Sequence, residues 1–155
     1  MKAYLDNAAT TGVSKEVFEA MTPYFMDSYG NPSSLHNKGI EVKKVVNLCH
    51  KTVAELLGCH YSEVHFTSCG TESINWAIKG IAYLNKTKSE IITTRIEHHA
   101  TLHTVEFLEK RGYTVHYLDV DEQGFINIDQ LRNLVSDNTL IVSIIMANNE
   151  IGTIQ

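Results

Sequence analysis

Apolar residues recur at intervals of four along the first predicted helix, from Val17 to Phe25. This spacing places them on one face and predicts a short amphipathic helix over residues 14–26. Ser14 is in position to cap its amino terminus. Pro23 carries no backbone N–H, so we expect the helix to end early or to kink there.

A loop and a longer helix are predicted next. Gly, Asn, Pro and Ser residues fill most of positions 29–34, a composition typical of a loop. Apolar residues then recur mainly at steps of three and four, which predicts a helix over 38–57 that stops at Gly58. Residues 1–12, ahead of both helices, read as an extended arm that ends in a turn near Gly12.

The pattern changes after residue 62, where short apolar runs alternate with helical spacing. We predict strands at 63–67, 90–94, 114–118 and 140–146, and helices at 71–85, 100–111 and 128–135. This alternation indicates right-handed βαβ crossovers, and so an α/β fold with a mostly parallel sheet and helices on both faces. The chain therefore divides into an arm and helical segment, 1–62, and an α/β domain, 63–155.

The α/β domain is expected to be incomplete. Its last predicted strand, 140–146, is apolar throughout and needs cover on both faces. The few residues that follow this strand supply little of that cover.

Composition places the chain among ordinary globular proteins and excludes several function classes. Of its 155 residues, 43% are apolar and 20% are charged, and 13 basic against 18 acidic side chains give a formal net charge of −5. This balance gives no general attraction to nucleic acid or to an anionic membrane. The amino terminus lacks the apolar stretch of a signal peptide, and no run approaches the roughly 18 apolar residues of a membrane span, so we expect a cytoplasmic protein. Three cysteines without a CxxC pair predict no disulfide framework.

The turn between the first predicted strand and its helix is a candidate phosphate site. Residues 66–73 read FTSCGTES. A strand, a turn of small residues and a helix start direct backbone N–H groups outward at the positive end of the helix dipole, an arrangement that binds phosphate. Gly70 lets an anion approach the backbone, and Thr71 adds a hydroxyl. The alternative is a plain helix start without a ligand.

A histidine follows the next predicted strand. The carboxyl ends of strands line the ligand crevice of an open α/β sheet, so we expect His98 at this edge, near the phosphate turn. Its imidazole can stack on a flat cofactor ring or carry protons. The alternatives are a surface histidine at a helix start and a zinc set of His98, His99 and His103 with Glu97. No further ligand stands at a suitable spacing, so no metal site is predicted.

Two amides and a carboxylate follow the last predicted strand, in Asn148-Asn149-Glu150. Such groups are costly to bury unless a polar partner uses them. Asn149 can donate to a phenolate or carboxylate oxygen of a ligand, and the alternative is a turn built from Asn and Gly. Together, the phosphate turn, the imidazole and the amide lie at three strand ends of one sheet, which predicts a single cofactor site.

The chain resembles the NifS/IscS-type cysteine desulfurases of the class V aminotransferase group in five segments. These are YLDNAATT at 4–11, YGNPSSLH at 29–36, FTSCGTES at 66–73, EH at 97–98 and ANNEIG at 147–152. The resemblance runs in register along the whole chain.

This resemblance implies the amino-terminal part of the large domain of a fold-type I enzyme that uses pyridoxal 5′-phosphate and is usually a homodimer. Members of the family take sulfur from L-cysteine, which leaves alanine and an enzyme persulfide, and pass the sulfur to an iron–sulfur scaffold or another acceptor. The resemblance implies that Gly70 and Thr71 hold the phosphate and that His98 stacks on the pyridine ring and transfers protons. It also implies that Asn149 contacts the ring 3-hydroxyl and the substrate, and that Asn7 lies near the substrate.

Two features depart from the family pattern. Cys69 stands where the family usually has Gly or Ala, beside the phosphate, and is not the family's catalytic cysteine. The family's Schiff-base lysine, in a Ser-x-His-Lys context, its pyridinium-pairing aspartate and its persulfide cysteine all lie beyond Gln155. We therefore expect a truncated portion that is inactive alone.

Three hypotheses stay open. The first is the amino-terminal portion of a cysteine desulfurase. The second is a related class V enzyme such as selenocysteine lyase. The third is a non-catalytic fragment or dimerisation module that associates with a full-length desulfurase subunit, which predicts exposed apolar surface and self-association.

Overall fold

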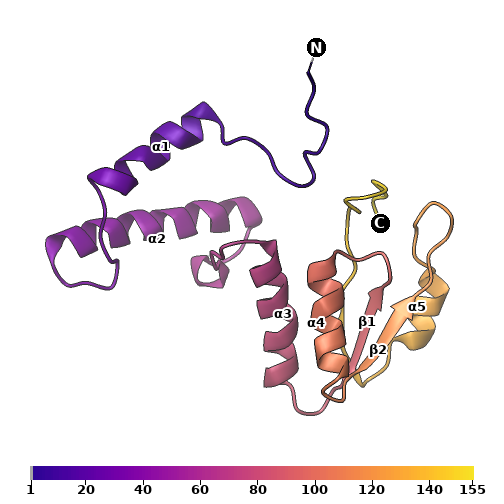
Figure 1. Cartoon of the computed structure of the whole chain (residues 1–155). Coiled ribbons are helices and arrows are strands. Elements are labelled where there is room, and N and C mark those ends of the chain that lie inside the picture. The colour runs from indigo at the N-terminus through magenta and orange to yellow at the C-terminus, as the bar shows by residue number, and fades with distance from the viewer. Residues whose placement is uncertain (1) are drawn as a thin grey trace. The chain divides into compact units, whose positions relative to one another are not determined.

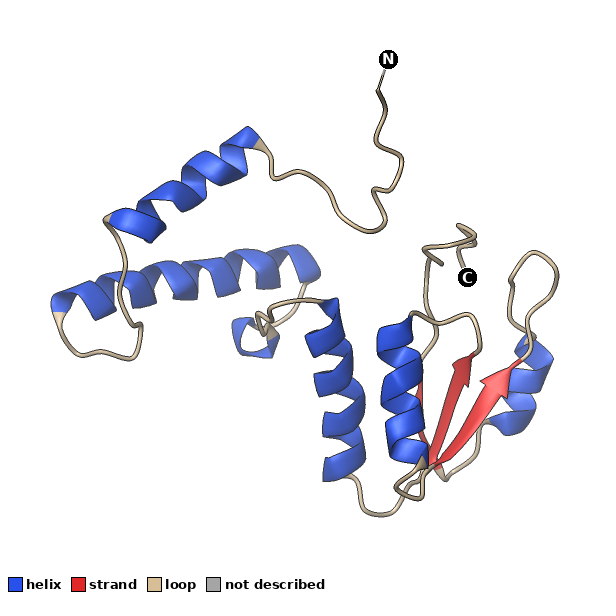
Figure 2. Ribbon diagram, viewed as in Figure 1, coloured by secondary structure: helices blue, strands red, loops and turns tan. Residues whose placement is uncertain are grey.

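The structure is a computed structural model that describes residues 2–155 (Figures 1 and 2). It divides into two compact units, one that runs to Phe66 and one from Thr67 to Gln155. The predicted domain boundary between residues 62 and 63 stays a prediction. Within the described part of the chain, no helix is both long and apolar enough to cross a membrane.

Helix α1 (Lys15–Met26) opens the regular structure of the first unit. Its start agrees with the prediction, because the Ser14 side chain accepts a hydrogen bond of 3.3 Å from the Val17 N–H. The expected early end at Pro23 is wrong, because the helix continues for three more residues. The alternative, a kink at Pro23, stays a prediction. Its last turn holds because the Asp27 N–H donates to the Pro23 carbonyl at 2.9 Å.

Helix α2 (Asn37–Leu57) follows the loop, as predicted. Gly58 ends it with a φ of 67°, a left-handed conformation that favours glycine. Near the start of α2, the loop packs directly onto the helix at Gly39. A Cβ placed on Gly39 would lie 2.6 Å from the carbonyl oxygens of Asn31 and Ser34, so only glycine fits this contact.

Two expectations about the first unit differ from the structure. The turn in the arm lies earlier than Gly12, because the Asp6 carbonyl accepts a hydrogen bond from the Ala9 N–H at 3.2 Å. The predicted strand over 63–67 is wrong. A short 3-10 helix, η1 (Tyr61–Glu63), ends at the first residue of this segment, and the residues after it pair with no strand in the part of the chain that the structure describes.

The second unit alternates helices and strands, as the sequence predicts. Its elements are α3 (Gly70–Leu84), β1 (Glu90–Thr94), α4 (His99–Glu109), β2 (Thr114–Leu118), α5 (Ile128–Leu134) and β3 (Thr139–Val142). The three strands are parallel in the order β2-β1-β3. Because α4 leads from β1 to β2 and α5 leads back past β1 to β3, right-handed crossovers place these helices on opposite faces (Figure 1). The predicted α/β fold is confirmed.

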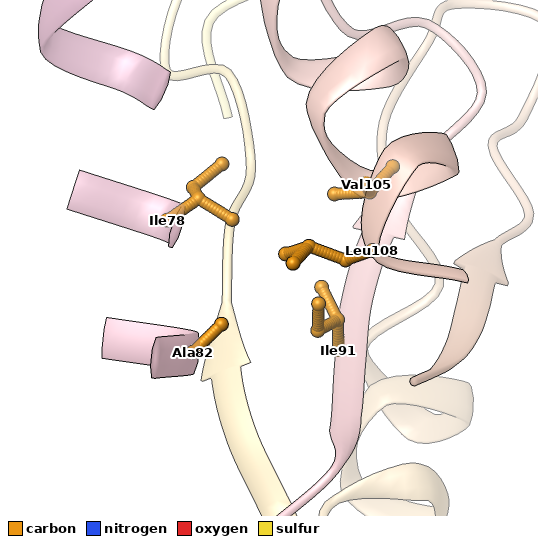
Figure 3. Packing of buried hydrophobic residues seen from close by; sticks show 5 residues of the cluster. All are labelled: Ile78, Ala82, Ile91, Val105 and Leu108. Atoms are coloured by element: carbon orange, nitrogen blue, oxygen red, sulfur yellow. The ribbon is translucent and has the colours of Figure 1, made fainter. Parts of the chain in front are cut away.

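The core of the second unit lies between β1 and the helices α3 and α4 (Figure 3). Ile78 and Ala82 on α3, Val105 and Leu108 on α4, and Ile91 on β1 point toward one another, and none of them is more than 3% exposed. Burial of these side chains removes apolar surface from water and fixes both helices against the sheet. The amino-terminal ends of α3 and α4 are thereby held in place.

Strand β3 ends at Val142, short of the predicted 140–146. The Ser143 N–H still donates to the Ile92 carbonyl at 2.9 Å. Two residues later, the Ile145 N–H donates to the Glu97 carboxylate at 2.6 Å instead of to a backbone carbonyl. A side chain thus replaces the strand partner, and the ladder stops where the chain meets the loop after β1.

Candidate functional site

The turn before α3 is held in shape by its own side chains. Both the backbone N–H and the hydroxyl of Ser68 donate to the Glu72 carboxylate at 2.6 Å. The hydroxyls of Thr67 and Ser73 share a hydrogen bond of 2.6 Å across the same turn. Cys69 occupies the position before α3 and makes no side-chain cap. The start of α3 is therefore ordered, and the Cys69 thiol lies beside its first N–H groups.

The start of α3 favours negative charge. The pKa of the Cys69 thiol is lowered, mainly because the backbone N–H of Glu72 stabilises the thiolate, and further because the Ser68 hydroxyl and the Thr71 N–H do so as well. A Cβ placed on Gly70 would meet no atom within 4 Å, so the backbone is open to an approaching group. N–H donors at a helix start beside open space suit a phosphate.

His98 lies between the end of β1 and the start of α4, where it caps the helix. Its ring Nδ1 accepts a hydrogen bond of 3.0 Å from the Ala100 N–H. Because Nδ1 acts as an acceptor, the neutral ring carries its proton on Nε2. This bond also fixes the direction in which the ring projects from the loop.

The two amides after β3 have different environments. Asn148 is 5% exposed and its side chain is fully engaged: Nδ2 donates to the Ile96 carbonyl at 2.7 Å, and Oδ1 accepts from the N–H groups of Glu150 and Ile151 at 2.8 and 3.0 Å. Asn149 is exposed, and its only hydrogen bond in the described part of the chain joins Nδ2 to the Glu150 carboxylate at 3.2 Å. Asn149 is therefore the amide that a ligand can reach.

Two cavities adjoin His98. The larger, of about 370 Å³, is lined by residues 95–99 and 148–151 with Leu102, and so contains both His98 and Asn149. Its size lies within the range of small-molecule sites. The second cavity, of about 340 Å³, is lined by the starts of α3 and α4 and contains Thr71 together with His98. His98 thus connects the surroundings of the phosphate turn with those of the amide.

The structure does not place every predicted site residue in these cavities. Gly70 lines neither of them, although it directly precedes Thr71. Asn7 belongs to the first unit, so its place near the substrate stays a prediction. The cofactor and substrate roles of Gly70, Thr71, His98 and Asn149 also stay predictions, to which the shared cavities give a spatial basis.

The alternative zinc set is not assembled. Within residues 2–155, no group of three or more His, Cys, Asp or Glu side chains is arranged to hold a metal ion. The rings of His99 and His103 stack at 5.4 Å between centroids, and His103 Nδ1 lies 3.3 Å from the Glu106 carboxylate. The three cysteines are all free and exposed.

Sequence reasoning missed two buried polar residues beside the site, Glu97 and Asn148. Glu97 is 8% exposed and joins the loop after β1 to the chain after β3. The sequence pairs Asn148 with Asn149 as neighbouring amides and contains no periodicity that separates the buried one from the exposed one. The only signal for Glu97 is a carboxylate next to an apolar strand, which also fits a surface residue.

Comparison with known proteins gives the same family for sequence and structure. The sequence pattern of the family described as aminotransferase class-V matches residues 3–155. The chain is 52% identical over 155 residues to a cysteine desulfurase IscS from Clostridium botulinum, covering 99% of this chain and 39% of that protein. It is 54% identical over 153 residues to a cysteine desulfurase IscS from Methanosarcina thermophila, covering 98% and 38%. The chain therefore spans about two fifths of the length of these curated relatives.

Solved structures share the fold of the chain. A NifS-like protein superposes with a TM-score of 0.96 and 46% identity, covering 100% of this chain and 43% of that one. SspA in complex with cysteine superposes with a TM-score of 0.93 and 38% identity, covering 99% and 45%.

Proposed function

The chain belongs to the aminotransferase class-V family, and we propose from this membership that it forms the amino-terminal portion of a pyridoxal 5′-phosphate-dependent cysteine desulfurase. The reaction removes sulfur from L-cysteine and leaves alanine and an enzyme persulfide. Identity of 52% with a cysteine desulfurase supports the activity, and 38% identity with a protein solved in complex with cysteine supports the substrate. The observation that carries the site is the position of His98 on both cavities, beside Thr71 and beside Asn149.

The residues of the second unit fit the two parts of this cofactor. Gly70 and Thr71 would hold its phosphate, because N–H donors and open space meet at the start of α3. His98 would lie against the pyridine ring, and the Asn149 amide would donate to the ring oxygen. When bound, the cofactor supplies an electron sink that stabilises negative charge on the substrate carbon.

His98 also has a defined hydrogen-bond donor. Its Nδ1 is occupied by the Ala100 N–H, so the proton of the neutral ring sits on Nε2. We therefore propose that neutral His98 presents its Nε2–H to the substrate as a hydrogen-bond donor.

Other parts of the proposal rest on the family. The proposal includes a homodimer, or association with a full-length subunit. It also includes transfer of sulfur to an iron–sulfur scaffold or other acceptor, and a cytoplasmic location. No lysine of residues 1–155 stands in a Ser-x-His-Lys context. We therefore expect this chain to bind the cofactor without converting cysteine by itself.

A chimaera tests the activity. Residues 1–155 replace the matching segment of the Clostridium botulinum relative, to which they are 52% identical. We expect the chimaera to release alanine from L-cysteine, and to release sulfide when an added thiol reduces the enzyme persulfide. We expect His98→Ala to abolish both releases while the variant stays folded. The unaltered relative serves as the positive control, and the isolated chain as the negative one.

Two results would reject the proposed activity. A folded chimaera that retains the cofactor but releases no alanine would show that these residues do not support desulfuration. Release from selenocysteine but not from cysteine would favour the selenocysteine lyase alternative. In the isolated chain, alanine release would contradict the expectation that it is inactive alone.

A non-catalytic module is the second candidate, and one observation favours it. No residue of α1 is buried, and large apolar side chains such as Phe18 and Phe25 are 63% and 73% exposed. Exposed apolar surface of this kind favours association with another chain. Sedimentation of the isolated chain, alone and mixed with the full-length relative, distinguishes a monomer from an assembly.

A further inference from the structure

Two short segments carry most of the side chains that line the larger cavity, and His99 and Leu102 of α4 supply the rest. The first segment, residues 95–98, follows β1 and ends at His98. The second segment, residues 143–151, follows β3, and its residues 148–151 line the cavity. Neither segment is regular secondary structure, so the sheet alone does not fix the distance between His98 and Asn149. Two buried side chains, Glu97 and Asn148, connect the segments directly.

Glu97 makes the connection from the first segment to the second. Its carboxylate is 8% exposed and accepts a hydrogen bond of 2.6 Å from the Ile145 N–H. The same oxygen accepts from the Thr94 hydroxyl at 3.2 Å, which ties the carboxylate back to the end of β1. Burial raises the pKa of the Glu97 carboxyl, while the Ile145 N–H and the Thr94 hydroxyl act in the opposite direction. Burial of a carboxyl group costs folding free energy unless hydrogen bonds replace its lost contacts with water.

Asn148 makes the connection in the reverse direction. Its Nδ2 donates to the Ile96 carbonyl at 2.7 Å, across to the first segment. Its Oδ1 serves a separate purpose, because it accepts from Glu150 and Ile151 and so shapes the turn that presents Asn149. The donor end of the amide therefore joins the segments, and the acceptor end builds the local turn.

We propose that Glu97 and Asn148 are positioning residues. They hold the segments that contain His98 and Asn149 at a fixed separation, so that the His98 and Asn149 side chains contact the same ligand ring. Each residue lines the larger cavity, lies next in sequence to the residue that it supports, and is bonded to the opposite segment. Loss of either cross-link would leave the phosphate turn before α3 unchanged, because neither residue bonds to it. This inference rests on the proposed cofactor roles of His98 and Asn149.

The chemistry of the two side chains allows matched variants. Asn148→Asp keeps an oxygen for the turn but replaces the Nδ2 donor by a carboxylate oxygen that faces the Ile96 carbonyl. The cross-link is lost and a negative charge is added, and the effect of that charge on anion binding is reported by the inorganic phosphate titration. Glu97→Ala removes the acceptor for the Ile145 N–H. Glu97→Gln keeps a carbonyl oxygen of the same reach and serves as the conservative rescue.

Two probes separate ring binding from phosphate binding. Pyridoxine 5′-phosphate has the ring and the phosphate but no aldehyde, so it does not react with the lysines of the chain. Inorganic phosphate tests the turn alone. Affinities of both probes are measured by NMR titration for the wild-type chain and the three variants, and thermal unfolding reports whether each variant is folded.

We expect Asn148→Asp and Glu97→Ala to weaken pyridoxine 5′-phosphate about tenfold each, the effect of one lost hydrogen bond. Affinity for inorganic phosphate should be unchanged, and Glu97→Gln should restore most of the ring-dependent affinity. If Asn148→Asp and Glu97→Ala lose affinity equally for both probes, the two residues have a merely structural role. If the affinities for both probes are unchanged, the residues have no role. Either result overturns the proposal. If the wild-type chain binds pyridoxine 5′-phosphate no more tightly than inorganic phosphate, the proposed function itself fails, and this positioning role fails with it.

Discussion

The substitution Gly70→Ala separates cofactor binding from folding. Gly70 is the first residue of α3 and lies outside the positive-φ region, so alanine can adopt its backbone conformation. The added Cβ would meet no atom within 4 Å. The methyl group would instead fill part of the open space that the proposed phosphate needs in order to reach the N–H groups of the helix start.

The expected effects on folding and on binding have opposite signs. Alanine reduces the freedom of the unfolded chain, so the free energy of unfolding should rise by at most about 1 kcal/mol. Loss of one hydrogen bond to a charged phosphate weakens binding by about 1.5–3 kcal/mol, or about tenfold to a hundredfold. Gly80→Ala is the matched control in the same helix, because its Cβ would make an ordinary contact of 3.7 Å with Trp76.

Titration with inorganic phosphate and pyridoxine 5′-phosphate measures binding, and urea unfolding measures stability. Gly80→Ala should bind both probes as the wild-type chain does. Gly70→Ala should bind both of them more weakly while unfolding at the same or a higher urea concentration. Undiminished affinity of Gly70→Ala for phosphate would refute the assignment of this turn as the phosphate site.

Three further predictions test the structure. The Cys69 thiol should react with iodoacetamide at a lower pH than an ordinary thiol, since its lowered pKa increases the thiolate fraction, and phosphate should slow this reaction selectively. Peptide mass spectrometry at several pH values checks both effects. Thr104→Val should stabilise the chain by roughly 1 kcal/mol, because the buried Thr104 hydroxyl has no hydrogen-bond partner among residues 2–155. Thr94→Val should destabilise the chain by a similar amount, because it removes the hydrogen bond to Glu97. Urea unfolding measures both variants, and an equal change in the free energy of unfolding for Thr104→Val and Thr94→Val would contradict the prediction. Gly39→Ala should lower the free energy of unfolding by about 1–3 kcal/mol, because its Cβ would lie 2.6 Å from two carbonyl oxygens. Gly80→Ala should raise the free energy of unfolding by up to about 1 kcal/mol, and urea unfolding measures both changes.

Periodic segments of the second unit were predictable from the sequence. The strands β1 and β2 have the predicted bounds, and α3 and α4 agree with prediction to within two residues. These elements bury one apolar face, so their spacing reports their structure directly. The left-handed Gly58 at the end of α2 was equally predictable, because glycine tolerates a φ of 67°.

Elements that depend on distant partners were not predictable. Residues 63–67 have the composition of a strand, but a strand forms only beside another strand. β3 ends early because Glu97, nearly fifty residues away, takes the Ile145 N–H. The same limit applies to the site. Asn148 and Asn149 are the same residue type, and the partner that distinguishes the buried Asn148, the Ile96 carbonyl, lies about fifty residues away in the sequence.

The central claim is that Thr71, His98 and Asn149 surround one vitamin B6 ring and its phosphate. Intermolecular nuclear Overhauser effects between isotope-labelled chain and bound pyridoxine 5′-phosphate test it most directly. We expect contacts from the ring protons to the His98 imidazole and to the Asn149 side chain, with the phosphate shifting the Thr71 N–H signal. Ring contacts that involve neither His98 nor Asn149, in a complex that forms, would contradict the claim.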